Sequence, residues 1–463
     1  MIHHGINTPS GMTPKCTHHQ SQGRFRRLFP QLPRLISNSH DLRECGKKNG
    51  PMDSGAEAKL SDIDLGYVFL GQFIDHDITL DVTSSLSSRN TPDDINNIRT
   101  PTLDLDCIYG SGVEGTPHLY YHAPPNASGK PKQIDKLHLL TNGDDLLRAE
   151  STPQGHLNQV ALIGDPRNDE NRIVSQFQLL MHYFHNTVVN ELLTKGSYTT
   201  KTALFEKARE IVTWHYQWVV IYDFLPKLVG QTVVDDIMCN GRRFFTEDNS
   251  PFIPVEFSVA AYRFGHTMVT NPLDFNESHK DVTMFGSELG TGFQKNTAGA
   301  INWNWFFGED AQKAGAVDEK LPSELLELPF IKNAEASLAV RNLQRGQSFS
   351  LPSGQSVHKY MESVLGVSLD SPDMSMFELP GNLAQATPLW LYILCEGSLS
   401  GGNHLGPVGG YIVAEVLIGL IESDPHSFLG SNPSWYPELK VQGSQPAGAF
   451  EMADIIKYTD FAA

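Results

Sequence analysis

Apolar residues recur at helical spacing over much of the chain. Between residues 170 and 193 they form one continuous stripe, made of Ile173, Phe177, Leu180, Phe184, Val188 and Leu192. Side chains three or four positions apart share one face of an α-helix, so this pattern predicts a long helix there. A second helix is expected from about Thr202 to Leu225, ending before Pro226, because proline breaks a helix.

Shorter apolar patterns, separated by proline and glycine, predict further helices. They cover residues 255–270, 322–328, 334–345, 355–364, 387–396 and 408–422. An earlier helix is expected from Ser61, which can cap it, to Asp77, with Leu65, Phe69 and Phe73 on one face.

The remaining segments predict loops. Residues 1–60 are rich in glycine, proline and histidine and indicate an irregular, partly mobile arm, and residues 111–160 indicate loops with short strands. No internal repeat or linker divides the chain. We therefore expect the mainly α class, with a single large helical domain at residues 21–463 that has long loops and little β-structure. An irregular N-terminal arm at residues 1–20 precedes it.

Composition excludes several classes of protein. The chain of 463 residues has 53 acidic and 35 basic residues, a net charge of −18, and only 19% of its residues are charged. The low charged fraction argues against a disordered chain. The negative charge argues against nucleic-acid partners, because phosphates would be repelled. The five cysteines are widely spaced without a CxxC motif, which argues against a disulfide framework or a structural zinc site.

The sequence shows no targeting or membrane segment. The first residues lack an apolar stretch, so no signal peptide is visible and we expect a cytoplasmic protein, with secretion by a route that needs no signal peptide left open. The longest apolar run, from Tyr411 to Ile421, is interrupted by Glu415. It is about half of the roughly 20 residues that a membrane span needs, so we expect no membrane span.

The first candidate for chemistry is Gln72-Phe73-Ile74-Asp75-His76-Asp77. On a helix, Gln72 and His76 are four positions apart and share a face, with Asp75 beside it. Asp77 lies about 100° round the helix from His76 and points elsewhere. The segment thus presents an imidazole with an amide on one side and a carboxylate on another. The alternative is a helix end with solvated charges.

A second candidate is the alternating segment Thr100-Pro101-Thr102-Leu103-Asp104-Leu105-Asp106. In an extended chain, alternate residues face one side, which would carry two threonines and two aspartates. Hard cations such as calcium take six to eight oxygen ligands, and Asp77 could add a third carboxylate. The alternative is a solvated strand edge.

Two further segments carry candidate ligands. Arg167 and Glu170 lie three positions apart in Gly164-Asp165-Pro166-Arg167-Asn168-Asp169-Glu170, so both can reach one pocket, and a structural salt bridge is the alternative. His266 ends the mostly apolar segment 256–266. A neutral imidazole is a good axial ligand for iron. A core histidine with its hydrogen bonds satisfied is the alternative.

These four segments, in this order, resemble the animal-type haem peroxidases, within the peroxidase–cyclooxygenase superfamily. GQFIDHD is similar to the distal-histidine motif, TPTLDLDCIYG to the calcium loop, GDPRNDEN to the distal-arginine motif and YRFGH to the proximal-histidine motif. The segments at 23–30, 341–346, 351–354 and 405–410 also fit, so the resemblance covers about residues 20–430. The compact length looks more like bacterial members than secreted animal ones.

The resemblance implies roles for individual residues. His76 matches the distal histidine, Gln72 its hydrogen-bonding neighbour and Arg167 the distal arginine. His266 matches the ligand of the haem iron, and the amide oxygen of Asn342 is expected to hold its Nδ1–H. Further haem contacts are expected from Arg263 and Arg345, which would pair with propionates, and from Asp75 and Glu170, which match carboxylates that form ester bonds to haem b. The calcium ligands are expected to be Asp77, Thr100, Thr102, Asp104 and Asp106.

The resemblance implies a peroxidase that reduces hydrogen peroxide through a high-valent iron-oxo intermediate. It would oxidise small anions, such as halide or thiocyanate, or aromatic organic donors, in a response to oxidative stress. A haem-dependent fatty-acid dioxygenase is an alternative. Those enzymes need a tyrosine three residues before the proximal histidine. This chain has Arg263 at that position, and Tyr262 lies one residue earlier. A non-catalytic haem sensor is a third interpretation. The electron donor, the number of ester bonds and the oligomeric state stay open.

Overall fold

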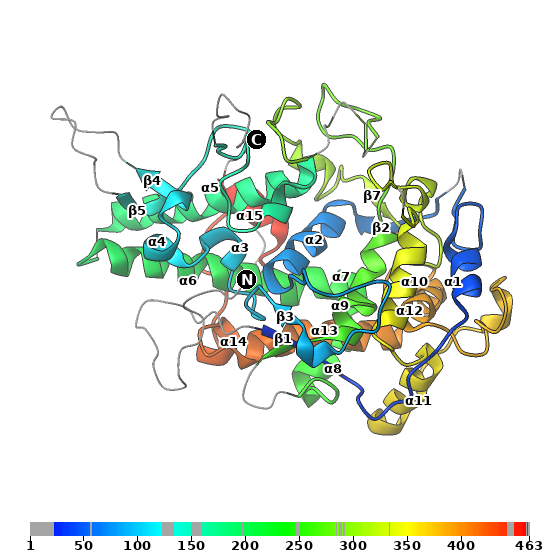
Figure 1. Cartoon of the computed structure of the whole chain (residues 1–463). Helices are drawn as coiled ribbons and strands as arrows, with labels where there is room; N and C mark the ends of the chain where they lie inside the picture. Colours follow the sequence, from blue (N-terminus) through cyan, green and yellow to red (C-terminus); the bar gives the residue numbers. More distant parts are fainter. Residues whose placement is uncertain are drawn as a thin grey trace.

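Helices dominate the structure, which is a computed structural model (Figure 1). It describes residues 23–55, 58–122, 134–149, 159–196, 198–246, 251–283, 285–286, 289, 292–332, 334–441, 449–459 and 461. The predicted arm at residues 1–20 lies outside this part. The α-helices are α1 (Ser39–Gly46), α2 (Gly66–Ile78), α3 (Asp106–Tyr109), α4 (Gly112–Gly115), α5 (Arg172–Lys195), α6 (Lys201–Val219), α7 (Leu225–Val229), α8 (Gln231–Asn240), α9 (Val255–Ser258), α10 (Leu338–Ser348), α11 (Gly354–Leu365), α12 (Leu389–Gly397), α13 (Pro407–Ser423), α14 (Phe428–Ser431) and α15 (Met452–Thr459).

The strands are short. They are β1 (Gly23–Arg26), β2 (Leu60–Asp64), β3 (Asn96–Asn97), β4 (Tyr120–His122), β5 (Ile134–Leu139), β6 (Phe252–Pro254) and β7 (Lys313–Gly315). β1 pairs antiparallel with β3 and parallel with β6, while β2 pairs with β7 and β4 with β5, both antiparallel. The predicted mainly α class with little β-structure is confirmed.

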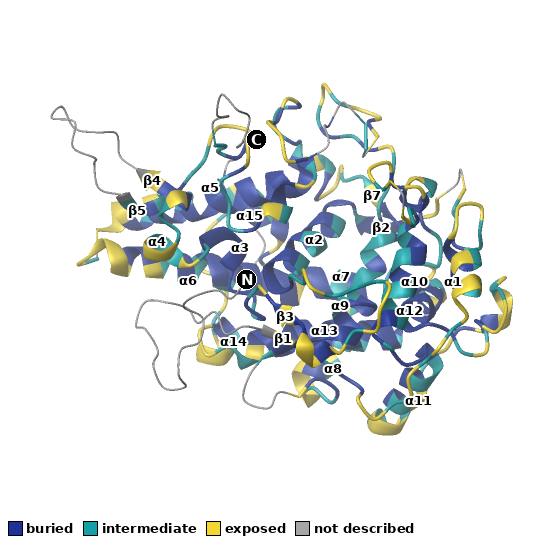
Figure 2. Ribbon diagram, viewed as in Figure 1, coloured by how far each residue is buried: buried dark blue, intermediate teal, exposed yellow. Residues whose placement is uncertain are grey.

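The long helix α5 forms where the apolar stripe predicts it. Every residue of that stripe, from Ile173 to Leu192, is buried. The side chain of Asn171 caps the helix by accepting a hydrogen bond from the backbone N–H of Val174, and Gly196 ends it in a left-handed conformation with φ 67°. α5 packs against α2 and α6, and the faces between these helices are buried (Figure 2).

The predicted start of the helix at Ser61 is wrong. Residues 60–64 form strand β2, and the hydroxyl of Ser61 donates to the carbonyl of Ala314 beside β7. The helix α2 begins only at Gly66, where a Cβ atom would lie 2.4 Å from the ring of Phe307. A distant strand partner therefore overrides the local capping signal. The C-terminal part of α2, which carries Gln72 to Asp77, is helical as predicted.

Several other boundaries differ from the sequence prediction. The helix expected to end before Pro226 ends at Val219, and the π-helical turn η4 (Val220–Phe224) leads into α7, whose first turn accepts the proline. The helix expected at 255–270 is divided into α9 and the 3₁₀ helix η5 (Ala261–His266). Residues 23–55, expected as part of an irregular arm, include β1 and α1.

The segment 100–106 is not extended. Residues 101–104 form a series of bends, Leu105 adopts a left-handed conformation with φ 59°, and α3 begins at Asp106. The two threonines and two aspartates therefore do not line one side of a strand. The carboxylates of Asp104 and Asp106 meet because the chain turns back on itself.

Candidate functional site

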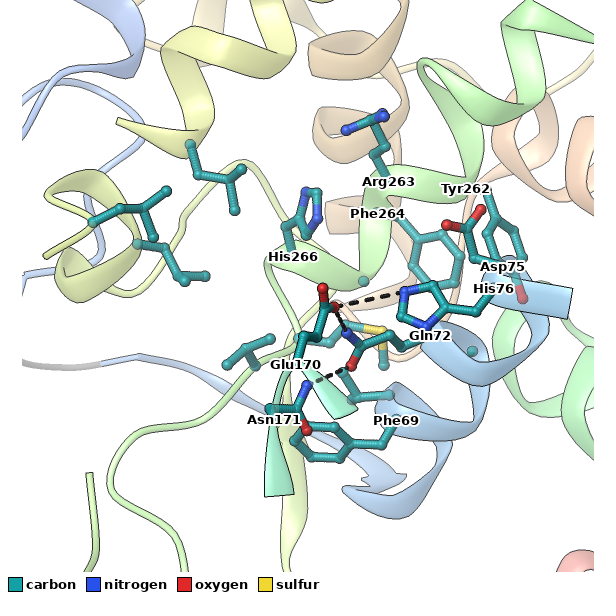
Figure 3. Close-up of a pocket in the computed structure, with 18 of the residues that line it drawn as sticks. Phe69, Gln72, Asp75, His76, Glu170, Asn171, Tyr262, Arg263, Phe264 and His266 are labelled. Carbon is teal, nitrogen blue, oxygen red and sulfur yellow. Dashed lines mark hydrogen bonds and ion pairs between the residues drawn. The ribbon is translucent and has the colours of Figure 1, made fainter. Parts of the chain in front are cut away.

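A cavity of about 960 Å³ lies between α2 and η5. From α2 it receives Gln72, Asp75 and His76, and from η5 it receives Arg263 and His266 (Figure 3). Most of its remaining lining is apolar, with contributions from Val68, Phe69, Phe224, Leu228, Phe264, Met268, Leu325, Leu328 and Phe330. A largely apolar cavity with a few convergent polar groups is typical of a cofactor or ligand site.

His76 faces this cavity as a neutral imidazole. Only 5% of the residue is exposed, and its Nδ1 lies 2.7 Å from the side-chain oxygen of Asn168. Burial lowers the pKa of His76, and the charge of Arg167 lowers it further. The ring therefore stays unprotonated at neutral pH, as a general base must.

A hydrogen-bonded group lies beside His76 on the same wall. Nε2 of Gln72 donates to the carboxylate of Glu170, whose Oε1 lies 3.6 Å from Nε2 of His76. The amide of Asn171 donates to the side-chain oxygen of Gln72 over 3.1 Å. The structure thus brings together Gln72, His76 and Glu170 (Figure 3).

His266 lies in η5, on the other side of the cavity from α2. Burial, with a smaller effect from Arg263, lowers the pKa of His266 to about 3, so the ring is neutral. Its Nδ1 lies 2.9 Å from Nδ2 of Asn342. The amide oxygen, expected to face Nδ1, instead accepts a hydrogen bond from Arg263 over 3.1 Å. The predicted contact between Asn342 and His266 is present. In this haem-free structure the amide nitrogen faces Nδ1, because the guanidinium takes the oxygen.

The structure does not bring all three predicted arginines to the cavity. Arg263 lines it. Arg167 does not, since its guanidinium donates to the backbone carbonyls of His76 and Thr79, over 3.0 and 2.5 Å, and to Asp165. Arg345 donates to the hydroxyl of Ser84 over 2.6 Å and is likewise absent from the lining.

Asp77 points away from the cavity into an acidic cluster. It lies with Asp104 and Asp106, and oxygens of the three side chains fall within 4.8 Å of one another. All three are buried, and burial with mutual repulsion raises the pKa of Asp77 well above its ordinary value. Oδ1 of Asp77 has no hydrogen-bond partner of normal geometry among the described residues.

The donor set of this cluster suits a hard cation. The Thr100 hydroxyl donates to Asp104 over 2.8 Å, and its backbone N–H donates to Asp106 over 3.1 Å. Three buried carboxylates are costly without a compensating positive charge, and Arg99 contacts only Asp106 among them. The side chain of Thr102, in the same loop, is half-buried, and its role as a ligand stays a prediction.

Sequence reasoning missed Asn168, which touches His76 directly. Asn168 follows Arg167 in the chain, but its partner lies 92 positions away. The hydroxyl of Tyr262, which the sequence offered only as a misplaced dioxygenase tyrosine, lines the cavity and has no hydrogen-bond partner in the described part of the chain. No local pattern signals either contact, because each depends on how η3 (Pro166–Asp169) and η5 pack against α2.

Residues 81–363 match the family model described as animal haem peroxidase. The chain belongs to the animal haem peroxidase family. Membership implies a haem cofactor, and the matched region contains Arg167, Glu170, His266 and Asn342. In the described part of the chain, no helix combines the length and apolar character that crossing a membrane requires.

Several curated proteins are similar to this chain. Dual oxidase 2 from Homo sapiens is 23% identical over 389 residues, which cover 77% of this chain and 24% of that protein. Dual oxidase 1 from Caenorhabditis elegans is 27% identical over 249 residues, 50% of this chain and 15% of that protein. A peroxidase-like protein from Margaritifera margaritifera is 24% identical over 373 residues, 65% of this chain and 47% of that protein. The chain thus spans less than half the length of these relatives.

Solved structures with the same fold include enzymes of two kinds. Peroxidase A from Dictyostelium discoideum superposes with a TM-score of 0.59 at 15% identity, over 95% of this chain and 93% of that chain. The fatty acid alpha-dioxygenase of Oryza sativa also gives a TM-score of 0.59, at 14% identity, over 96% of this chain and 80% of that chain. At these identities the likeness shows a common fold alone.

Proposed function

We propose that this protein is a haem-dependent peroxidase that takes hydrogen peroxide and a small electron donor. The observation that carries the proposal is one cavity with a neutral imidazole on each of two walls, His76 from α2 and His266 from η5. One imidazole can bind a metal while the other handles protons. The donor would be a small anion or an aromatic compound.

The residues of the cavity fit a haem. Its apolar lining suits a flat macrocycle, and the neutral ring of His266 would offer the lone pair of Nε2 to iron with its proton on Nδ1. Arg263 would pair with a propionate, and Asp75 and Glu170 lie in the wall where ester bonds to the macrocycle would form. The haem would supply the electron-transfer chemistry, and the protein supplies orientation, proton transfer and exclusion of water.

His76 would move the proton of the peroxide. Its Nδ1 is occupied by the contact with Asn168, so its Nε2 would accept a proton from one peroxide oxygen and deliver it to the departing one. Gln72 would keep Glu170 in place beside the ring. A distal arginine would stabilise the negative charge that develops on the departing hydroxide. Arg167 binds the backbone carbonyls of His76 and Thr79, so it could take this role only if its guanidinium left them.

We assign calcium to the acidic cluster. Asp77, Asp104 and Asp106 would be its carboxylate ligands, with Thr100 and Thr102 completing the oxygen set. The cation would offset three buried charges and anchor Asp77 at the end of α2. His76 is the neighbour of Asp77 in this helix, so the cation would steady the proton-transfer residue.

A fatty-acid oxygenase is the second candidate. The unpartnered hydroxyl of Tyr262 in the cavity favours it, as does the fold shared with alpha-dioxygenases. Arg263 at the position expected for the reactive tyrosine weighs against it. Oxygen consumption with palmitate and no peroxide would support this candidate, whereas the peroxidase consumes peroxide and needs no fatty acid.

The peroxide reaction of a His76→Ala variant tests the proposal. The haem-loaded wild type should consume hydrogen peroxide and oxidise guaiacol or bromide. His76→Ala should keep its haem and react with peroxide about 10²- to 10⁴-fold more slowly, as measured by rapid-mixing absorption spectroscopy. His40→Ala, an exposed histidine of α1, is the control and should react like the wild type. An undiminished reaction in His76→Ala would remove His76 from the mechanism.

A further inference from the structure

A chain of buried hydrogen bonds leads away from His76 into the protein. Nδ1 of His76 lies 2.7 Å from Oδ1 of Asn168, and Nδ2 of Asn168 donates to Oε1 of Gln178 over 2.7 Å. Nε2 of Gln178 lies 2.9 Å from Nε2 of His182, and Nδ1 of His182 lies 2.8 Å from the backbone carbonyl of Leu140. The chain joins α2, η3, α5 and the loop after β5.

The far end of this chain fixes the direction of every bond in it. The carbonyl of Leu140 can only accept, so Nδ1 of His182 carries the proton and its Nε2 is an acceptor. Gln178 must then donate to His182, which leaves its oxygen to accept from Asn168. The oxygen of Asn168 therefore faces His76 and accepts its Nδ1–H.

We propose that Asn168, Gln178 and His182 are positioning residues that hold His76 in the Nδ1–H tautomer, with the lone pair of Nε2 directed to the cavity. This tautomer is the one that can take a proton from a substrate in the cavity. The importance of the chain for peroxide chemistry rests on the proposed function, whereas the tautomer itself does not.

Burial allows only one arrangement of donors and acceptors in this chain of hydrogen bonds. Asn168 and Gln178 are fully buried, and His182 is 1% exposed. Water cannot replace a missing partner there, and an unpaired buried polar group is costly, so one reversed bond would leave two donors or two acceptors facing each other. Burial lowers the pKa of His182 to about 4, so this ring is also neutral at pH 7 and keeps one donor and one acceptor.

The tautomer of His76 can be measured without any catalytic assay. Long-range ¹H–¹⁵N spectra of the full chain, labelled with ¹⁵N-histidine and free of haem, show which nitrogen of each ring carries the proton. A His76→Gln variant assigns the signals of His76. We expect His76 to carry its proton on Nδ1. A proton found on Nε2 of His76 would overturn the proposal.

A variant of Gln178 interrupts this chain of hydrogen bonds at a residue that does not line the cavity. Gln178→Leu should shift the tautomer ratio of His76 by about 2- to 12-fold, the equilibrium value of one hydrogen bond. Gln176→Leu is the matched control, since Gln176 is also a buried amide of α5 but bonds, among the described residues, to the backbone of Asp144 and Ile301.

Haem-loaded samples separate this proposal from the proposed function. Gln178→Leu should slow the reaction with peroxide by the factor by which the population of the Nδ1–H tautomer of His76 falls. Its haem content should be unchanged. Where Gln178→Leu fails to fold, Asn168→Ser breaks the first bond without adding volume to the core and should shift the ratio in the same direction. Equal tautomer ratios in Gln176→Leu and the chain-breaking variants would contradict the proposal, even if the wild type proves to be a peroxidase.

Discussion

At the scale of single residues, the two imidazoles of the cavity are held in different ways. His76 has an acceptor at its Nδ1, the oxygen of Asn168. His266 faces the amide nitrogen of Asn342, a donor, so its Nδ1 acts as the acceptor and the proton lies on Nε2. A ring that binds iron through Nε2 needs the opposite tautomer. Haem binding would therefore be coupled to a rotation of the Asn342 side-chain amide that brings its oxygen to Nδ1. This rotation would also break the hydrogen bond that Arg263 donates to that oxygen.

Substitution of Asn342 tests this coupling. Asn342→Leu removes any acceptor for Nδ1–H of His266 and should weaken haem affinity by about 10- to 100-fold, the usual effect of losing such a partner. Asn342→Asp offers only acceptors and can also pair with Arg263, so it should bind haem at least as well as the wild type. Competition for haem with an excess of a second haem-binding apoprotein measures both values. Equal losses in the two variants would show that the acceptor at Nδ1 does not matter.

At the scale of elements, α2 joins the cavity to the acidic cluster. Gln72, Asp75 and His76 point to the cavity, and Asp77 points to Asp104 and Asp106. The helical repeat alone predicts this division, because adjacent residues lie about 100° apart. The C-terminal end of the helix is held by Arg167, which binds the carbonyls of His76 and Thr79. A cation in the cluster would hold the same end from the other side.

Calcium should therefore stabilise the haem-free protein. At a free calcium concentration of about 100 times Kd, a site that exists only in the folded state adds roughly 2.7 kcal/mol to the free energy of unfolding. The melting temperature should rise with calcium and fall again with a chelator. Asp77→Asn removes one carboxylate and should lose most of this response, while Asp62→Asn, on the exposed face of β2, should keep it. A response that is equal in the wild type and Asp77→Asn would place calcium elsewhere.

At the scale of the whole molecule, the sequence predicts the positions of the helices better than the contacts between distant segments. The expected helices at 355–364, 387–396 and 408–422 match α11, α12 and α13 to within two residues, because apolar spacing marks their length and proline or glycine their ends. Strand β2 was not predictable, because its partner β7 lies about 250 positions away in the sequence and no local pattern encodes such pairing.

In the candidate site, too, local spacing was predictable and long-range contacts were not. Spacing on one helix correctly grouped Gln72, Asp75 and His76, and the acidic loop was correctly expected to meet Asp77. The orientation of long polar side chains was not predictable. Arg167 satisfies carbonyls at the end of α2, and Arg263 takes the oxygen of Asn342, because buried guanidinium groups bind the acceptors that packing puts within reach.

Titration of the haem-free chain with haem, followed by absorption spectroscopy, tests the central claim most directly. We predict a ligated-haem spectrum that saturates at one haem per chain. His266→Ala should lose this spectrum while His76→Ala retains it, because His266 is the proposed ligand of the iron and His76 is not. A chain that takes up no haem, or a His266→Ala variant whose spectrum and affinity equal those of the wild type, would contradict the account.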